Sequence, residues 1–401
     1  MSVKPPPKGK PIDIEELRRL KQAKKEMKKA LNKNAPPPPP PPKVLQRQLK
    51  EISTVDTGRD QVRIMSFNIL AQSLIKRELF PDSGDILKWK TRRSLIVEEI
   101  GLYDADIMSL QEVDNFDSFF KENLFNLGYE TVYCHHPSKK HGCTISYKKD
   151  KFNQVKYQTI DYNTDTLCSP SIMTNNIGQI LALEYKENPS VGFVVGNTHM
   201  YWRPSCNYER LRQTAIYVKH LLDLKSELSS HVRWMPLLLG DFNTTPDDPV
   251  YSILTENKLT PDHLKDLRES LEVTISNRSN DDKKEGVEPE DEVASVPIDP
   301  HSIIGVEELV SLFQLCKDPW KSIYSHTKEI QKEYGLFGEP SFTNYTAVFK
   351  GTLDYLFIQR NMSVKRILML PSEEDLKPSL PNRNFGSDHL CLVADVELLL
   401  D

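Results

Sequence analysis

Ligand-type side chains stand at the ends of short apolar runs along this chain. The run at residues 234–239 (WMPLLL) ends in a glycine, and Asp241 and Asn243 follow it, so a carboxylate and an amide two positions apart leave one end of a buried strand. The arrangement recurs at other apolar runs, which lead to Asn68, Glu112, His199, Asp354, Asp388 and His389. The repetition indicates one metal-dependent hydrolytic site that is assembled from many strand ends.

The carboxylates of this set point to a divalent cation. Glu112, Asp241, Asp354 and Asp388 adjoin strands that we expect to be buried, and a buried charge without a partner costs about 3–5 kcal/mol. Any one of them would more often be a helix cap, a turn residue or half of an ion pair, but four together would repel one another. Oxygen ligands with few thiols select Mg²⁺, or Mn²⁺, over Zn²⁺.

The two histidines differ in their context. Asp388 and His389 are adjacent, so both can face one site only if the backbone is not extended, and residues 384–387 (NFGS) predict such a loop. His389 needs a carboxylate to orient its ring, and Asp354 is the best candidate. His199 can stabilise charge on a phosphoryl oxygen, although a lone histidine is more often a structural hydrogen-bonding residue.

A second group of metal-type ligands supplies a rival hypothesis. Cys134, His135, His136, His141 and Cys143 resemble a zinc cluster. The gap between the two cysteines is too wide for a single CxxC knuckle and the sequence has no second knuckle, so we do not favour zinc. Residues 142–147 (GCTISY) are more typical of the start of a core strand.

Helical and strand patterns alternate along most of the chain. Helical spacing covers residues 86–103, 117–127 and 208–228, and strands are expected near residues 132, 144, 181 and 194. This mixing predicts an α/β sandwich rather than a helix bundle or an all-β fold. We expect one catalytic domain over residues 59–401, with a disordered acidic insertion at residues 265–299 and a helix at residues 306–316.

The first 58 residues are predicted to be a mostly disordered basic tail. Residues 1–43 carry twelve Lys or Arg and four Asp or Glu, a charge of about +8, whereas the whole chain of 401 residues carries −5. A solvated helix is expected at residues 12–31, followed by a polyproline II segment at residues 36–42. We favour a plain spacer over an SH3- or WW-type binding site for the prolines. For the basic tail, nonspecific binding of phosphate polymers and a solubilising or localising role are equally open.

The composition argues against several classes of protein. No apolar stretch approaches the ~20 residues that a membrane helix needs, and the N-terminus lacks the apolar core of a secretory signal. The six cysteines are scattered, which indicates reduced thiols rather than a disulfide framework. We therefore expect a cytoplasmic protein that does not bind a membrane, with a nuclear or mitochondrial pool left open.

The candidate residues lie in six short motifs, which occur in a fixed order. These are residues 66–70 (SFNIL), 110–113 (LQEV), 197–199 (NTH), 240–243 (GDFN), 353–355 (LDY) and 387–389 (SDH). Each motif alone is weak, but six in register are specific. Together they resemble the endonuclease/exonuclease/phosphatase superfamily.

Three further features resemble one branch of that superfamily, the RNA 3′-exonucleases that include the carbon-catabolite-repressor deadenylases, nocturnin and the Ngl proteins. Residues 199–204 (HMYWRP) match its H-x-x-W-x-P element, and residues 343–351 match the stretch before its aspartate. Residues 79–85 (LFPDSGD) are most similar to the Ngl type. The carbon-catabolite-repressor deadenylases join a larger complex through a leucine-rich repeat, and we expect no such docking module in this chain.

The resemblance implies a four-layer αββα sandwich, in which two packed mixed β-sheets are flanked by helices. It also implies a metal site, where Glu112 binds Mg²⁺ and Asn68 and Asp388 hold or orient the metal. In related deadenylases a proline and a phenylalanine sandwich the 3′ adenine, and the matching residues here are Pro204 and Phe349.

The catalytic roles implied by the resemblance fall on the remaining residues. Asp241 would align or deprotonate the attacking water, and Asn243 would position the phosphate. His389, oriented by Asp354, would contact the scissile phosphate. His199 would stabilise the transition state.

These expectations combine into one function with two alternatives. We expect a monomeric Mg²⁺-dependent 3′→5′ exoribonuclease that releases 5′-mononucleotides from RNA 3′ ends, in poly(A) removal or in the maturation of structured RNAs such as rRNA. The first alternative is a nocturnin-like phosphatase that acts on a dinucleotide cofactor or another small phosphate ester. The second is an inactive RNA-binding module, which the complete set of ligand positions disfavours.

Overall fold

A computed structural model of the chain describes residues 15, 19–26, 40–53, 60–256, 258–276, 298–315 and 318–399. Contacts divide the chain into two units, Met1–Pro41 and Pro42–Asp401. In the first unit residues 19–26 are helical, in agreement with part of the predicted helix. Residues 36–39 of the predicted polyproline segment lie outside the described residues, as does most of the predicted disordered tail.

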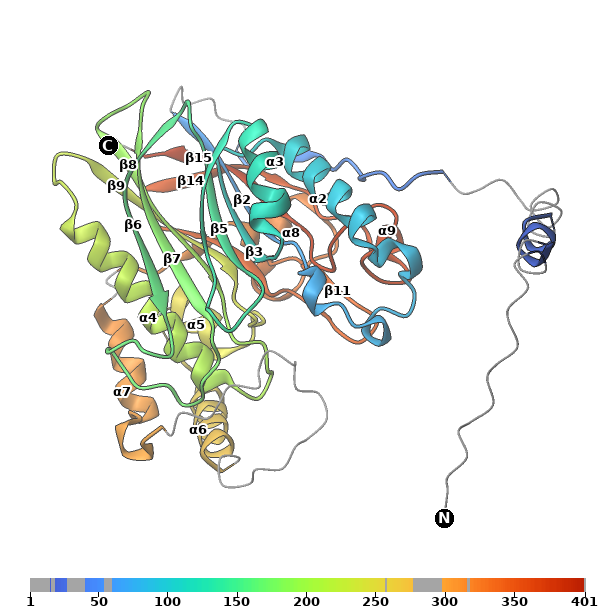
Figure 1. Ribbon diagram of the computed structural model, residues 1–401. Helices are drawn as coiled ribbons and strands as arrows, with labels where there is room; N and C mark the ends of the chain where they lie inside the picture. Colours follow the sequence, from blue (N-terminus) through green and yellow to red (C-terminus); the bar gives the residue numbers. More distant parts are fainter. Residues whose placement is uncertain are drawn as a thin grey trace, which may run out of the picture. The chain divides into compact units, whose positions relative to one another are not determined.

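Two mixed β-sheets form the centre of the second unit (Figure 1). In spatial order the first sheet contains β1 (Leu49–Glu51), β14 (Met362–Leu368), β15 (Leu392–Leu398), β2 (Gln61–Asn68), β3 (Ile107–Val113), β5 (Gly142–Lys148) and β4 (Tyr129–Cys134). The second contains β10 (Lys321–Ser322), β13 (Asp354–Ile358), β9 (Arg233–Asp241), β8 (Val191–His199), β7 (Ile177–Tyr185) and β6 (Phe152–Asp161). β2 pairs with β3 and β8 with β9 in parallel, and the other neighbours are antiparallel.

The two sheets pack face to face because their strands are apolar on both sides. In β2, Val62 and Ile64 join the cluster between the sheets, whereas Met65 and Phe67 join the cluster beneath the helices. Residues with period two on a strand face opposite sides of the sheet. A strand that is covered on both sides therefore reads as a nearly continuous apolar run.

Helices cover the outer face of each sheet. On the first sheet lie α2 (Trp89–Tyr103) and α3 (Lys121–Asn126), the latter preceded by a π-helical turn (Phe116–Phe120). The second sheet is covered by α4 (Asn207–Glu227), α5 (Pro249–Glu256), α6 (Pro261–Ser276) and α7 (Val306–Ser311). The order helix, sheet, sheet, helix confirms the predicted αββα sandwich (Figure 1).

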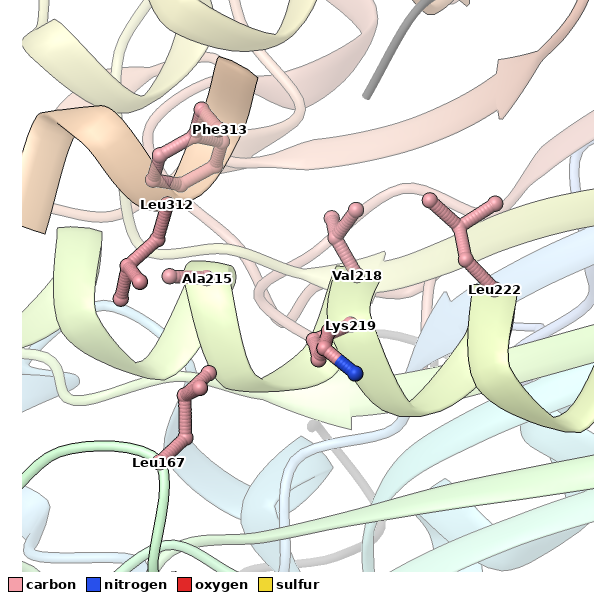
Figure 2. Close-up of a pocket in the computed structure, with 7 residues that line it drawn as sticks. All are labelled: Leu167, Ala215, Val218, Lys219, Leu222, Leu312 and Phe313. Carbon is pink, nitrogen blue, oxygen red and sulfur yellow. The ribbon is translucent and has the colours of Figure 1, made fainter. Parts of the chain in front are cut away.

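Short elements complete the second unit. They are a hairpin of β11 (Asn344–Tyr345) and β12 (Lys350–Gly351), the helices α8 (Thr327–Ile330) and α9 (Glu373–Leu376), and single 3₁₀ turns such as Leu312–Leu315. Figure 2 shows a hollow of about 20 Å³ between α4 and that 3₁₀ turn, lined by Leu167, Ala215, Val218, Lys219, Leu222, Leu312 and Phe313. Its lining is apolar except for Lys219, which pairs with Asp223, so it lacks the groups that hydrolysis needs.

Two predicted boundaries are wrong. The tail was expected to extend to residue 58, but β1 pairs with β14 and the second unit begins at Pro42. The apolar pattern of residues 44–52 is too short to reveal an edge strand that pairs across more than 300 positions. Residues 265–276 of the expected insertion instead belong to the helix α6, and residues 277–297 lie outside the described residues.

None of the helices among the described residues combines the length and the apolar character that a membrane span requires.

Candidate active site

Strand ends from both sheets meet at one edge of the sandwich. Because β8 and β9 are parallel and in register, His199 lies opposite Asp241. β13 runs antiparallel to β9, which places its first residue, Asp354, opposite Asp241 as well. In the other sheet β2 and β3 are parallel and end together, with Asn68 beside Gln111. The topology thus gathers residues that are far apart in the sequence.

The backbone at two of these positions adopts the left-handed conformation. Glu112 has φ of +57° and lies in an irregularity where the pairing of β3 with β5 shifts register. Asn243 has φ of +49°. Such a conformation costs a non-glycine residue about 1–3 kcal/mol and is concentrated at functional sites. Gly240 also has a positive φ, of +146°, and it is needed for a second reason, since a Cβ there would lie 2.2 Å from the Thr198 carbonyl oxygen.

The carboxylates of Glu112 and Asp241 are linked by Asn68. Its Nδ2 donates to Glu112 Oε1 and to Asp241 Oδ2, at 2.9 Å each. The backbone N–H of Ala71 donates to the other oxygen of Glu112 at 3.0 Å. Asn68 Oδ1 accepts from the Leu70 N–H at 3.0 Å, and a carbonyl oxygen has a second lone pair available.

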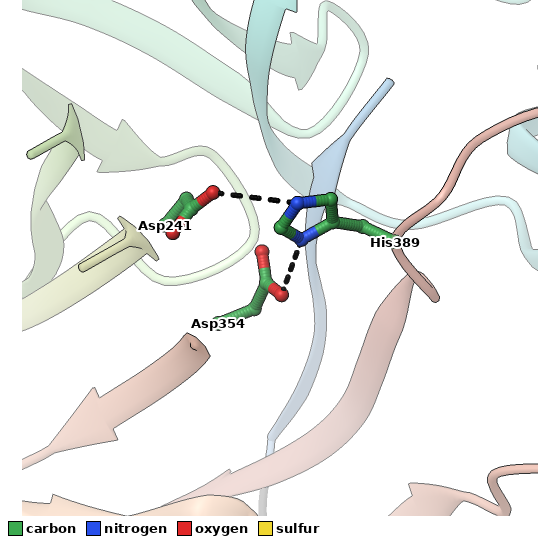
Figure 3. A group of neighbouring side chains, drawn as sticks. All are labelled: Asp241, Asp354 and His389. Carbon is green, nitrogen blue, oxygen red and sulfur yellow. Dashed lines mark hydrogen bonds and ion pairs between the residues drawn. The ribbon is translucent and has the colours of Figure 1, made fainter. Parts of the chain in front are cut away.

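His389 lies between two aspartates (Figure 3). Its Nδ1 is 2.8 Å from Asp354 Oδ2, and its Nε2 is 3.7 Å from Asp241 Oδ2. Thr343 fixes Asp354 by donating its hydroxyl at 2.6 Å. Although burial opposes it, the carboxylates of Asp354 and Asp241 raise the pKa of His389 well above its usual range.

Asp241 and His199 have pKa values shifted in opposite directions. Burial and the neighbouring Asp354 raise the pKa of Asp241 to about 7, against the effect of His389 and of hydrogen bonds from Asn68 and Asn243. Burial lowers the pKa of His199 to about 3, so its ring is neutral at pH 7. His199 Nε2 lies 3.6 Å from Asp241 Oδ2, and its carbonyl accepts from Asn176 Nδ2 at 2.8 Å.

Asn243 and the Asp388–His389 pair are held by their backbones. The Asn243 N–H donates to Asp241 Oδ1 at 2.9 Å, and its side chain donates to the Met200 carbonyl at 2.9 Å. Asp388 and His389 lie in an irregular loop, as the sequence predicted. Next to them, the Ser387 hydroxyl donates to the Asn68 carbonyl at 2.7 Å.

A cavity of about 220 Å³ opens above these residues. It is lined by Leu70, Leu74, Leu79, Phe80, Glu112, Lys139, His141, Asn176, His199, Trp202, Asp241, Asn243, Asp388 and His389. Glu112 and Asp388 therefore face one space, although 276 positions separate them. Among the described residues this lining does not include Pro204, which is exposed, or Phe349, which is 41% exposed.

The cavity contains groups that the motifs did not reveal. Lys139 and His141 enter it from the loop between β4 and β5, and the His141 ring lies 6.4 Å from that of His199. His141 belonged to the rival zinc hypothesis, but Cys134, His135, His136 and Cys143 do not line this cavity. The same cavity has an apolar wall at residues 70–80, which consists of Leu70, Leu74, Leu79 and Phe80. The only available signal was the position of His141 immediately before a core strand.

The donor set suits a hard divalent cation. Glu112 and Asp388 are each 9% exposed, and burial raises the pKa of Asp388. A cation held by the carboxylates of Glu112 and Asp388 and by the side-chain oxygen of Asn68 would stabilise the charged forms of these two carboxyl groups. The ligand atoms of Asp241, Asp354 and His389 also lie within 4.8 Å of one another. Because Asp354 holds Nδ1 of His389, we interpret that trio as a catalytic group rather than as the metal ligands.

Together the αββα fold and this site define a metal-dependent phosphoesterase, and sequence comparison agrees. The model of the "Endonuclease/Exonuclease/phosphatase family" matches residues 65–389, and the chain belongs to this family.

Relatives place the chain within the family. It is 29% identical to "RNA exonuclease NGL2" of Saccharomyces cerevisiae, over 84% of this chain and 78% of that protein. It is 30% identical to "Probable RNA exonuclease NGL3" of the same yeast, over 86% and 79%. The crystal structure of ANGEL2, described as a 2′,3′-cyclic phosphatase, covers 89% of this chain and 100% of its own, at 26% identity and a TM-score of 0.66. The predicted resemblance to the Ngl branch is confirmed.

Proposed function

We propose that this protein is a Mg²⁺-dependent 3′→5′ exoribonuclease that releases nucleoside 5′-monophosphates. The observation that carries the proposal is the convergence of the motifs: five of them line one cavity, and Asp354 of the sixth contacts His389 in that cavity. The similarity to two yeast proteins named as RNA exonucleases supports RNA as the substrate.

The protein's own groups divide the work of hydrolysis. Asp241, with a pKa of about 7, is suited to take the proton of the attacking water at neutral pH. The water oxygen bonds to phosphorus while the bond to the 3′ oxygen of the preceding nucleotide breaks. The His389 ring, oriented by Asp354, contacts the phosphate, and Asn243 helps to position the phosphate.

His199 and the metal would stabilise the charge that develops. A neutral His199 can donate a hydrogen bond to a phosphoryl oxygen without a counter-charge of its own. Glu112, Asp388 and Asn68 would hold Mg²⁺, which supplies Lewis-acid stabilisation when bound. Hard oxygen donors favour Mg²⁺ or Mn²⁺ over zinc.

The 3′ nucleotide would rest against apolar side chains. The wall at residues 70–80 and Trp202, which is 40% exposed, supply surfaces on which a base can stack. Such stacking contributes ~1–3 kcal/mol per base with little sequence preference. Pro204 and Phe349 are exposed and do not line the cavity, and we propose that they contact the 3′ adenine of a longer substrate.

A product analysis tests the proposal. Purified protein is incubated with end-labelled oligo(A), mixed-sequence RNA and DNA of equal length, with Mg²⁺ or with EDTA. We expect stepwise shortening of RNA from the 3′ end, release of 5′-AMP from oligo(A), and no reaction in EDTA. Products that carry a 3′ phosphate, or internal cleavage, would contradict it.

A second candidate is favoured by the likeness to ANGEL2. The hydrolysis of a terminal 2′,3′-cyclic phosphate uses the same water, base and phosphate contacts but leaves the polymer intact. The same assay therefore includes an oligomer with a 2′,3′-cyclic phosphate end, and NADPH as a small phosphate ester. Loss of the cyclic phosphate without shortening would establish this candidate in place of the exonuclease. Phosphate release from NADPH with intact oligo(A) would establish the nocturnin-like alternative.

A further inference from the structure

The segment that precedes the first long strand is bound to the loop that carries Asp388 and His389. We call residues 43–53 the strap and residues 382–391 the catalytic loop. We propose that the strap positions the catalytic loop, with Arg47 as the positioning residue, so that the strap is part of the active site's support. This inference rests on the roles proposed above for Asp388 and His389.

The strap contacts the catalytic loop before the functional pair. The Lys43 N–H donates to the Arg383 carbonyl at 3.0 Å, and the Leu45 N–H donates to the Asn384 carbonyl at 3.4 Å. The Arg47 guanidinium lies over the ring of Phe385, 6.0 Å from its centroid. Backbone and side chain therefore both hold residues 383–385.

The same arginine contacts the loop after the functional pair. Arg47 Nη2 donates to the Cys391 carbonyl at 3.0 Å and contacts Cys391 Sγ at 2.7 Å. Asp388 and His389 thus lie in a span whose two sides are held by one side chain. Farther along the strap, β1 pairs with β14 and fixes the strap to the sheet.

Arg47 is in turn fixed by helix α2. Arg47 Nη2 pairs with Glu99 at 2.9 Å, and both side chains are almost fully buried. The backbone N–H of Arg47 donates to the Tyr103 hydroxyl at 3.0 Å. The guanidinium also lies 5.4 Å from the Tyr103 ring centroid. A buried ion pair is a costly device when stability alone is at stake, because an apolar pair of similar volume is often as stable. Because the ion pair is directional, it fixes the position of the Arg47 guanidinium, and through it the two ends of the catalytic loop.

Two residues outside the strap also contact the catalytic loop. Arg92 Nε donates to the Gly386 carbonyl at 2.8 Å, and the Leu390 N–H donates to the Thr343 carbonyl at 2.7 Å. The strap therefore acts together with Arg92 and Thr343 in holding the catalytic loop. Supporting contacts of this kind typically change metal affinity or activity by 10–100-fold when they are removed.

The test compares point variants of the full chain. Arg47→Ala, Arg47→Lys and the control Gln46→Ala, an exposed neighbour on the strap, are measured for kcat and KM on oligo(A) and for Mn²⁺ affinity by calorimetry. All measurements are made well below each variant's Tm. We expect Arg47→Ala to lower kcat and Mn²⁺ affinity by about 10–100-fold with a smaller change in KM. Arg47→Lys should restore part of both, because an ammonium can pair with Glu99 as Nη2 does but lacks the guanidinium plane that lies over Tyr103 and Phe385.

A second pair of variants covers the case in which Arg47→Ala does not fold. Leu45→Pro removes the N–H that donates to Asn384, whereas Leu45→Ala removes the side chain and keeps that N–H. A larger loss of kcat and Mn²⁺ affinity in Leu45→Pro supports the proposal.

Two results separate this inference from the proposed function. If Arg47→Ala folds and keeps wild-type kcat and Mn²⁺ affinity, the role of the strap is overturned while the exonuclease stands. The same conclusion follows if Leu45→Pro has the same kcat and Mn²⁺ affinity as Leu45→Ala. A wild-type protein without RNA hydrolysis overturns the exonuclease. In that case the Mn²⁺ affinities alone decide whether the strap positions Asp388.

Discussion

Asp241 contacts several other side chains of the candidate active site. It accepts hydrogen bonds from Asn68 and Asn243, and lies within 4 Å of the rings of His199 and His389. Burial and Asp354 give it a pKa of about 7. A base with this pKa is available at neutral pH and is still strong enough to take a proton from water.

Asp241→Asn is expected to lower kcat by about 10²–10⁴-fold, the usual contribution of a general base. The amide keeps the size of the side chain but cannot take a proton. Steady-state kinetics on oligo(A) in Mg²⁺ check this, with the exposed Asp247→Asn as the matched control. Near wild-type turnover of Asp241→Asn would show that another group activates the water.

The same variant should change stability with a definite pH dependence. In the folded state without metal, Asp241 holds its proton up to about pH 7, whereas in the unfolded chain it titrates near its ordinary 3.8. The wild type should therefore lose stability as pH rises from about 4 to 7, because the unfolded state binds fewer protons in that interval. In EDTA, the Tm of Asp241→Asn relative to wild type should increase between pH 4 and pH 8. A constant difference across this range would contradict the raised pKa.

Glu112 is predicted to control the response to metal. In the wild type, Mg²⁺ at 100 times its dissociation constant should stabilise the fold by about 2.7 kcal/mol. Glu112→Gln should remove most of this gain and should also abolish hydrolysis. Thermal unfolding with and without Mg²⁺ measures the effect, and Glu122→Gln on the exposed face of α3 is the control. An equal Tm increase in Glu112→Gln and the wild type would place the metal elsewhere.

At the scale of elements, a polar layer joins the two sheets beneath the cavity. Gln111 on β3 donates to Asn197 Oδ1 on β8 at 2.8 Å, and Asn197 donates to the carbonyls of Leu110 and Thr144. Because hydrogen bonds are directional, this layer sets the register of one sheet against the other. The register matters, since Glu112 comes from one sheet and Asp241 from the other.

Asn197→Ala should destabilise the fold by about 1–3 kcal/mol, because the buried Leu110 and Thr144 carbonyls lose the Asn197 donor and the Gln111 amide loses the Asn197 acceptor. Guanidinium unfolding measures this loss. Asn153→Ala on the exposed side of the edge strand β6 should change stability by no more than about 0.5 kcal/mol. If the two variants were equally stable, the layer would have no role in holding the sheets.

At the scale of the whole molecule, most of the basic tail and the candidate active site belong to different units. Most of the charge of about +8 at residues 1–43 lies in the unit Met1–Pro41, and the site lies in Pro42–Asp401. Short substrates are expected to contact only the second unit. Long RNA adds phosphates that a basic segment can bind in a salt-dependent way.

Deletion of residues 1–41 should therefore leave kcat/KM on a short oligo(A) unchanged. Deletion of residues 1–58 should abolish activity, because it removes the strap and with it Arg47. Kinetics on oligomers of six and of forty nucleotides check both variants. Equal activity of the two deletions on the short oligomer would show that the strap is dispensable.

The sequence alone determined the chemistry and the class of fold. Residues such as Asn68, Glu112 and Asp241 are recognisable because hard ligands at the ends of apolar runs are a local pattern, and α2 and α4 are found from local periodicity. Tertiary structure decided what depends on distant pairing. The strap joins the sheet only through β14, and Arg47 gains its role only when α2 and the catalytic loop surround it.

The same reason separates the groups that were found from those that were missed. Lys139 lies in a loop without a motif for this site and His141 entered only the rival zinc hypothesis, and the packing of their loop against β8 brings both to the cavity. The pKa values of Asp241 and His199 likewise follow from burial and neighbours, which local sequence does not encode. Residue types and their order are written along the chain, whereas proximity across it is set by how the two sheets close on each other.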